Sequence, residues 1–405
     1  MPKFHYKATH AGGETYEETL DLPDRFAVYA EVRKVGGTVV SINEVREGLH
    51  IDVRKLISFF GSVRTSEKIV FARNLGAMLA AGLPLSRGLG VLERQTRNRH
   101  LREVLLSLIE GIKRGRSLHE AMEQFPKVFP KLFIAMVKAG DESGKLSGAL
   151  LGVADQVERS YMLTKKIRGA MMYPGIVLSA MVIIGITMLI FVVPTLTATF
   201  KEFDVQLPLT TRIIIGVSDW FVGNFLLAIF GVVGGVMGFI ALLRTPRGHR
   251  TFEFVLLRTP IIKGLVREVN TARTARTLSS LLSSGVEVIT AFSIAREVIQ
   301  NSYFREVLAE AQKQIQKGLQ IAPAFSQNEH LYPPLMGELI SVGEETGGLS
   351  TMLLQVATFY ENEVEQKTKN MSTIIEPILM VVIGIAVGFF ALSVISPIYS
   401  LSNAI

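Results

Sequence analysis

Three long stretches without a charged side chain constrain the fold of this sequence more than any other feature. They separate Arg168 from Lys201, Asp219 from Arg244, and Glu376 from the C-terminus. Each exceeds the ~20 residues that a helix needs to cross ~30 Å of hydrocarbon. The mean hydropathy of +0.34 points the same way. The sequence therefore predicts three transmembrane helices, at 171–195, 220–243 and 374–398.

Basic residues beside these stretches indicate the orientation, because cytoplasmic flanks of membrane helices are rich in Lys and Arg. They precede the first span, follow the second and precede the third, at Arg159, Lys165, Lys166, Arg168, Arg244, Arg247, Arg250, Arg258, Lys367 and Lys369. We therefore expect residues 1–170 and 244–373 in the cytoplasm, and an external loop at 196–219 and tail at 399–405. The first residues lack the apolar core of a signal peptide, so we expect a cytoplasmic N-terminus.

The three uncharged stretches, the third of which begins after Glu376, also contain no His. Ion paths and proton relays use charged residues or His, so a coupled transporter is disfavoured. Small-residue pairs at Gly231/Gly235, Gly234/Gly238 and Gly384/Gly388 fit either close helix contacts or the general abundance of glycine in membrane helices. The chain has no cysteine, which excludes disulfides, zinc thiolate sites and cysteine nucleophiles.

The cytoplasmic regions repeat each other at a constant offset of 203 positions. The motif Ala72-Arg73-Asn74-Leu75 matches Ala275-Arg276-Thr277-Leu278, and Gly140-Asp141-Glu142-Ser143-Gly144 matches Gly343-Glu344-Glu345-Thr346-Gly347. The register holds into the first and third spans. The repeated unit is thus a helical domain followed by a span, and the second span, inserted between the copies, returns the chain to the cytoplasm.

Each copy has the pattern of a six-helix bundle. In the first copy, Gly82 and Gly115 are helix stops, and Pro84 and Pro130 are helix starts. Ser117-Leu118-His119-Glu120 fits a capping box, and the sixth helix is expected to run from Leu146 into the first span. We therefore predict a mainly α membrane protein with two homologous cytoplasmic bundles, at 66–170 and 244–373.

The first 45 residues differ from the repeats. Strands are expected at Phe4–Ala8, Thr15–Leu20 and Thr38–Val45, and a helix at Arg25–Val35. This pattern predicts a small α+β domain at 1–45, with the Gly12-Gly13 pair in its first turn. The charged segment at 46–65 is expected to be a linker.

The Gly140–Gly144 turn resembles a phosphate loop only superficially. Three residues, not four, separate Gly140 from the Gly-Lys pair, and Leu146 follows where Ser or Thr is needed. A helix–turn–helix joint is the better interpretation, with Gly140, Glu142 and Gly144 matched by Gly343, Glu345 and Gly347. The acidic pairs Asp141/Glu142 and Glu344/Glu345 fit either a divalent cation or solvated turns, and solvated turns are commoner. The scattered histidines form no metal or catalytic spacing, so we expect no cofactor, no metal and no catalytic residues.

Charged residues kept in both copies are the candidate interaction sites. Arg73 and Arg276 are predicted opposite the apolar stripes of their helices, and Glu103 and Glu306 likewise. Such residues either dock a partner or the other copy, or persist by common ancestry. Basic residues lack interleaved aromatic residues, so nucleic-acid binding is not expected.

The sequence resembles the inner-membrane platform proteins of bacterial type IV pilus machines and type II secretion systems. The resemblance covers the whole chain and rests on Phe4-x-Tyr6-x-Ala8, on the two helical units with three spans, and on the paired turns Ala139–Gly144 and Val342–Gly347. Gly82-Leu83-Pro84-Leu85 also resembles the family's turn, although the second copy has Val286-Glu287 there. The family's usual residue at the position of Asp141 is uncharged or glutamate, which blurs the transfer of any ion site.

The resemblance implies a non-enzymatic, multi-pass platform in the bacterial inner membrane. Its implied partners are a cytoplasmic assembly ATPase, pilin or pseudopilin subunits, other inner-membrane assembly proteins, membrane lipid and further copies of itself. A polytopic transporter or a membrane-bound enzyme is the alternative. The residues themselves indicate only a scaffold-like architecture.

Overall fold

The computed structural model describes residues 3–9, 15–21, 25–34, 36, 38–45, 62–202 and 209–402. The chain divides into two units, Met1–Ser62 and Val63–Ile405, and the division falls inside the predicted linker. The predicted Gly12-Gly13 turn, most of the linker and the last three residues of the predicted tail lie outside the described residues.

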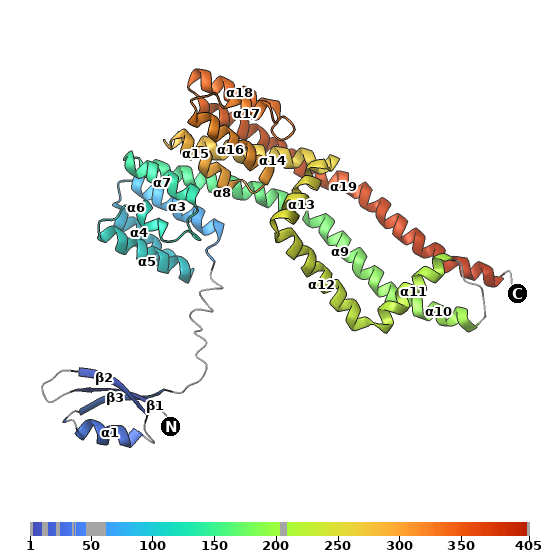
Figure 1. Ribbon diagram of the computed structural model, residues 1–405, viewed down its shortest axis with the longest axis horizontal. Helices are drawn as coiled ribbons and strands as arrows, with labels where there is room; N and C mark the ends of the chain where they lie inside the picture. Colours follow the sequence, from blue (N-terminus) through green and yellow to red (C-terminus); the bar gives the residue numbers. More distant parts are fainter. Residues whose placement is uncertain are drawn as a thin grey trace. The chain divides into compact units, whose positions relative to one another are not determined.

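The N-terminal unit is a three-stranded antiparallel sheet with one helix (Figure 1). Strand β1 is central, and the sheet order is β2-β1-β3. The side chains of Tyr6 and Ala8 alternate onto the face that packs with Val28 and Val32 of the helix. The predicted strands and helix are confirmed as β1 (Lys3–Thr9), β2 (Thr15–Asp21), α1 (Arg25–Lys34) and β3 (Thr38–Val45).

The first helical repeat has the six predicted helices. They are α3 (Thr65–Ala80), α4 (Leu85–Gln95), α5 (Arg99–Lys113), α6 (Leu118–Glu123), α7 (Lys131–Glu142) and α8 (Leu146–Ala170). The capping box is present at α6, where Ser117 and Glu120 bond each other's backbone N–H groups. Asn98 accepts from two N–H groups at the start of α5. Leu101, Val104, Leu105 and Leu108 share one face of α5 and lie in the buried core.

The second repeat has the same succession of helices. They are α14 (Pro260–Ser283), α15 (Val288–Val298), α16 (Ser302–Gln316), α17 (Ala322–Ser326), α18 (Pro334–Thr346) and α19 (Leu349–Ser402), preceded by α13 (Pro246–Arg258). Three pairs of glycines with positive φ stand at the offset of 203 positions, at Gly82/Gly285, Gly115/Gly318 and Gly144/Gly347. The backbone therefore repeats its turns as well as its helices, which confirms the internal duplication.

Two long helical runs leave the repeats side by side (Figure 1). Helix α8 continues through α9 (Met172–Thr187), the π-helical turn η1 (Met188–Val192) and α10 (Val193–Glu202). The runs at Leu146–Ala198 and Leu349–Ser393 are long and apolar enough to cross a membrane. The second predicted span coincides with α12 (Phe225–Arg244), of which Val233–Arg244 is an apolar helix of shorter length. The third crossing thus stays a prediction.

The segment predicted as an external loop is helical over most of its described residues. It comprises the end of α10 and α11 (Leu209–Gly223). Thr211 Oγ1 donates to the carbonyl oxygen of Ser393 at 2.7 Å, and Ser218 Oγ donates to that of Leu189 at 2.5 Å. These bonds hold α11 against both long helical runs, so the segment is a packed helix, and its predicted place outside the cytoplasm stays a prediction. The run of isoleucines from Ile213 gives this segment an apolar face that favours packing.

Candidate functional site: equivalent ion pairs and the contact between the repeats

The Gly140–Gly144 turn joins α7 to α8 and has no room for side chains at one key position. Gly144 has a φ of 70°, and Lys145 N–H donates to the carbonyl of Gly140 at 2.8 Å, which ends the helix in a Schellman motif. A Cβ on Gly140 would lie 2.1 Å from Cβ of Ala149. Gly140 therefore lets α7 and α8 approach closely, and the predicted helix–turn–helix joint is confirmed.

The second copy has the same type of turn between α18 and α19. Gly347 has a φ of 73°, and a Cβ on Gly343 would lie 2.8 Å from Cα of Leu349. The carboxylates of the motif, Glu142 and Glu345, are exposed in the last helical turn. The repeated glycines are thus packing residues, whereas the glutamates remain accessible.

The acidic residue before each of these glutamates holds the start of a short helix. The Oδ2 atom of Asp141 lies 3.2 Å from Nδ1 of His119 in α6. The carboxylate of Glu344 accepts from the N–H groups of Ile321 and Ala322, at 2.6 and 3.0 Å, at the start of α17. Because both oxygens of Glu344 are engaged by the backbone, they serve the fold in this arrangement. In the described part of the chain, no three His, Asp or Glu side chains gather as metal ligands would.

Arg73 and Arg276 each form an ion pair with a glutamate 85 residues further along the chain. Arg73 bonds Glu158 of α8, and Arg276 bonds Glu361 of α19. Arg276 binds with two nitrogens, Nε to Oε1 at 2.8 Å and Nη2 to Oε2 at 2.6 Å, and Nη2 also reaches Thr358. Each pair clamps the first helix of a repeat to its sixth.

The two pairs differ in burial. The side chain of Arg73 is 50% exposed, whereas that of Arg276 is 9% exposed. The expectation that Arg276 points away from the packed core is wrong. Helical periodicity places it opposite its own apolar stripe, but Glu361 and Thr358 of α19 bond it on that side of α14. Arg73 is accessible, as expected.

Glu103 and Glu306 both lie on exposed surfaces, in α5 and α16. Glu103 pairs with Arg99 one turn earlier, at 3.3 Å. Glu306 pairs with Arg250 of α13 at 2.7 Å, and Arg250 also lies over the ring of Tyr303. Hydrogen bonds to Glu306 and Tyr303 raise the pKa of Arg250. These surface pairs contribute little stability, so both carboxylates stay available to a partner.

A buried glutamine joins the two repeats. Gln156 of α8 is 3% exposed, although glutamine is rarely buried. Its Nε2 donates to Oγ1 of Thr277 at 3.4 Å, and its Oε1 accepts from Oγ of Ser280 at 2.8 Å, both in α14. Because buried amides need hydrogen-bond partners, these contacts fix how α8 sits on the second repeat.

Charged contacts surround Gln156. Lys131 of α7 bonds Glu297 of α15 at 2.8 Å, and Lys166 of α8 bonds Glu365 of α19 at 2.5 Å. The hydrogen bond from Lys166, followed by that from Lys369, lowers the pKa of Glu365. Burial lowers the pKa of Arg273, whose Nη2 donates to Thr164 of the first repeat at 3.0 Å. The repeats are thus joined by contacts from five helices, α7, α8, α14, α15 and α19.

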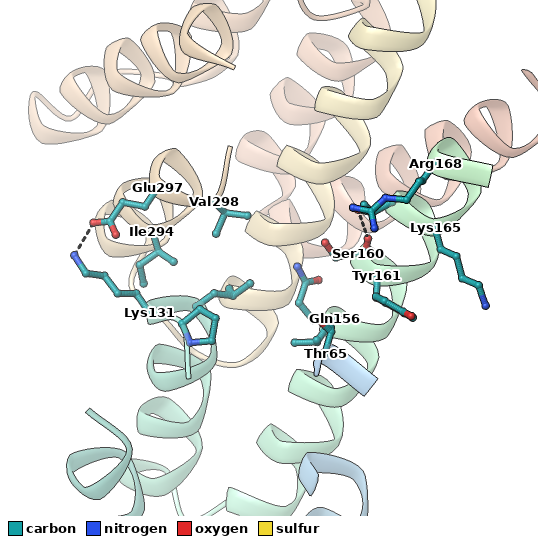
Figure 2. Close-up of a pocket in the computed structure, with 14 residues that line it drawn as sticks. Thr65, Lys131, Gln156, Ser160, Tyr161, Lys165, Arg168, Ile294, Glu297 and Val298 are labelled. Atoms are coloured by element: carbon teal, nitrogen blue, oxygen red, sulfur yellow. Dashed lines mark hydrogen bonds and ion pairs between the residues drawn. The ribbon is translucent and has the colours of Figure 1, made fainter. Parts of the chain in front are cut away.

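A cleft of about 620 Å³ lies beside this contact (Figure 2). Figure 2 shows Lys131 and Glu297 facing each other from the two repeats, while Lys165 points away from α8 toward the open side. The wall is formed by Thr65, Pro130, Lys131, Leu132, Gln156, Val157, Ser160, Tyr161, Thr164, Lys165, Arg168, Ile294, Glu297 and Val298. Glu297 is the sole carboxylate among these described lining residues, and Lys131 neutralises it. These described lining residues therefore contain no pair of carboxylates.

Comparison with known proteins identifies the family that has this architecture. The family described as "Type II secretion system (T2SS), protein F" matches the chain twice, over residues 71–194 and 274–397. The two ranges are offset by 203 positions and together cover more than half of the chain. The chain belongs to this family. The family's repeating domain therefore comprises the helices of one bundle and the long apolar run that follows.

Relatives of this family carry the names of two machines. Type IV pilus assembly protein PilC of Thermus thermophilus is 33% identical over 401 residues, covering 99% of this chain and 98% of that protein. Type II secretion system protein F of Aeromonas hydrophila is 33% identical over 387 residues, covering 93% and 97%. Type II secretion system protein F of Pseudomonas aeruginosa is 30% identical over 405 residues, covering both chains completely. The similarity thus extends through the N-terminal unit and both repeats.

Proposed function

We propose that this protein is a non-enzymatic platform in the bacterial inner membrane for assembly of a type IV pilus or a type II secretion pseudopilus. The observation that carries the proposal is the double match to the protein F family along one register. Full-length similarity to relatives named for pilus assembly and for type II secretion supports it.

Three membrane crossings, with a cytoplasmic N-terminus and both repeats in the cytoplasm, belong to this proposal. The helical runs at Leu146–Ala198 and Leu349–Ser393 supply two apolar spans. The first run passes from α8 through the single turn residue Met171 into α9, and the second lies within α19, so each repeat leads directly into an apolar helix. Helix α12 would supply the third crossing. Arg244 at its end and the basic residues of α13 favour a cytoplasmic second repeat.

Coupling of a cytoplasmic assembly ATPase to pilin or pseudopilin subunits is the mechanism we propose for the platform. The continuous helices could transmit a movement of the repeats to the membrane, because a helix keeps its length when it tilts. Glu103 and Glu306 are the candidate contacts for the ATPase, since both carboxylates are exposed. Arg73 is a further docking candidate, whereas the buried Arg276 acts as an internal clamp.

Deletion of the coding sequence in its native host tests the proposed function. We expect loss of surface filaments or of type II secreted proteins, while the pilin-like subunits remain in the inner membrane. Complementation with the wild-type chain should restore the lost activity, and membrane levels measured with an antibody control for expression. A deletion strain that keeps both filaments and secretion would contradict the proposal.

A further inference from the structure

The contact between the two repeats is head-to-tail. The first repeat contributes its last helices, through Lys131 of α7 and Gln156 of α8. The second repeat contributes its first helices, through Thr277 and Ser280 of α14 and Glu297 of α15. Since the repeats are homologous and use different faces, each retains one face of this kind unused. Interfaces of this heterologous type can continue to a further copy.

The unused face of the first repeat lies on α3. Val70, Asn74 and Ala77 occupy the positions equivalent to Arg273, Thr277 and Ser280. All three α3 side chains are exposed, and Val70 is 55% exposed. A hollow of about 320 Å³ lies on this face, and its described lining includes Ser66, Val70, Phe71, Asn74, Leu92 and Gln95. In the second repeat the same region of α14 is covered by α8.

The unused face of the second repeat lies on α19. Phe359 occupies the position equivalent to Gln156. It is 48% exposed, although its ring lies edge-on against Tyr360 at 5.0 Å between centroids. Gln156, by contrast, is buried against α14. An aromatic side chain is thus presented where the first repeat presents its docked amide.

The side chains on the two free faces are suited to contact each other. In the docked pair, the polar Gln156 meets Thr277 and Ser280. In the free pair, Phe359 stands in place of the glutamine, and Ala77 stands in place of the serine. On the α3 face Val70 also stands in place of Arg273, whereas Asn74 is polar like Thr277, so Phe359 would meet two apolar side chains and one polar one. We propose that Phe359 of one copy docks against Val70, Asn74 and Ala77 of a second copy, repeating the contact within the chain.

The membrane helices permit this repetition. Helices α9 and α19 run side by side in the same direction away from the repeats (Figure 1). The equivalent spans of the two repeats thus leave in a common direction. A second copy that docks as the second repeat docks on the first would keep this direction, so successive copies can share one membrane plane. The expected product is a ring or an open row of copies.

Arg73 changes environment in this arrangement. Arg276 lies one helical turn from Ser280, which bonds Gln156 of the docked first repeat, and it is almost buried with Glu361. Arg73 stands in the same relation to Ala77 and is half exposed with Glu158. Docking of a second copy beside Ala77 would reduce the exposure of the Arg73–Glu158 pair toward that of Arg276–Glu361. The retention of both arginines then follows from two equivalent interfaces.

Cysteine cross-linking tests the proposal directly, because the wild-type chain contains no cysteine. A full-length chain with Ala77→Cys is co-expressed with a differently tagged chain carrying Phe359→Cys, and membranes are treated with a short bis-maleimide. We expect a cross-linked heterodimer of the two tags. A second pair, Arg94→Cys with Pro334→Cys, should also cross-link between chains, because these positions correspond to the bonded Glu297 and Lys131.

Two controls make the outcome decisive. Lys131→Cys/Glu297→Cys within one chain should cross-link internally, since these exposed side chains are in contact. Leu354→Cys, which is exposed on another side of α19, should give no heterodimer with Ala77→Cys. Failure of both intermolecular pairs while the internal control cross-links would overturn the proposal. So would a cross-link of Phe359→Cys to itself, which indicates a symmetric dimer instead.

Discussion

Arg276 of α14 and Glu361 of α19 form a bidentate ion pair that is almost completely buried. The equivalent pair in the first repeat, Arg73 and Glu158, has the same spacing in the sequence and is largely exposed. The same chemistry is therefore present in two environments within one chain. The pairs offer an internal comparison of buried and exposed ion pairs on homologous helices.

Replacing each arginine by methionine should show how much each ion pair contributes to stability. Removal of one partner from a buried pair leaves an uncompensated charge and costs about 3–5 kcal/mol. An exposed pair contributes about 0–1 kcal/mol. We predict a strong loss of thermal stability for Arg276→Met and a small one for Arg73→Met, measured on the full-length protein in detergent. Equal losses for the two variants would show that the difference in burial has no energetic consequence.

Gly140 tests the close approach of α7 and α8. A methyl group at this position overlaps Ala149, so we expect Gly140→Ala to cost about 3 kcal/mol or more, the upper range for overpacking. Gly148→Ala is the matched control, because it is exposed in the same helix pair and its Cβ would meet open space. Alanine there should stabilise the helix by about 0.5–1 kcal/mol. Opposite shifts of the melting temperature are predicted, and a neutral Gly140→Ala would argue against the close contact.

Gln156 tests the contact between the repeats. Gln156→Ala removes the partner of Ser280 and Thr277 and should cost about 1–3 kcal/mol, the range for leaving buried polar groups unpaired. The neighbouring Asp155→Ala affects only an exposed contact with Arg159 and should change stability by less than about 0.5 kcal/mol. Thermal unfolding of both variants measures the difference. Similar stabilities would mean that the buried amide does not hold the repeats together.

The Lys166–Glu365 bond gives the same contact a pH dependence. The pKa of Glu365 is lowered in the folded protein, chiefly by Lys166. Its contribution is therefore complete above the unfolded pKa of about 4.3 and is lost as the pH falls through the lower folded pKa. The difference in melting temperature between wild type and Lys166→Met should stay constant from about pH 7 to 5 and shrink below about pH 4. A difference that already declines between pH 7 and 6 would assign the effect to another group.

The local structure followed closely from residues with strong conformational preferences. Gly82, Gly115 and Gly144 adopt the positive φ that ends their helices, and Ser117 with Glu120 forms the predicted capping box. The strands of the N-terminal unit followed from alternation and turn residues. Such features depend on a few neighbouring residues, so sequence alone could place them.

The burial of individual side chains could not be predicted in this way. Arg73 and Arg276 occupy equivalent positions in the two repeats, yet their side chains are 50% and 9% exposed, because burial depends on packing between distant segments. The glutamates that pair with these arginines could have been predicted from the duplication, because Glu158 and Glu361 also match at the offset of 203 positions. The packing of α11 against the two long helical runs involves hydroxyl contacts with distant carbonyl groups, which no local pattern reveals.

Accessibility of single cysteines in spheroplasts tests most directly that both repeats stand on the cytoplasmic side of a membrane crossed three times. Cysteines replace Arg114 and its repeat equivalent Lys317, or Pro208 between the first two predicted spans, and are treated with a membrane-impermeant thiol reagent. We predict labelling of Pro208→Cys in intact spheroplasts, and labelling of Arg114→Cys and Lys317→Cys only after permeabilisation. Labelling of Lys317→Cys in intact spheroplasts would place the second repeat outside and contradict the platform architecture.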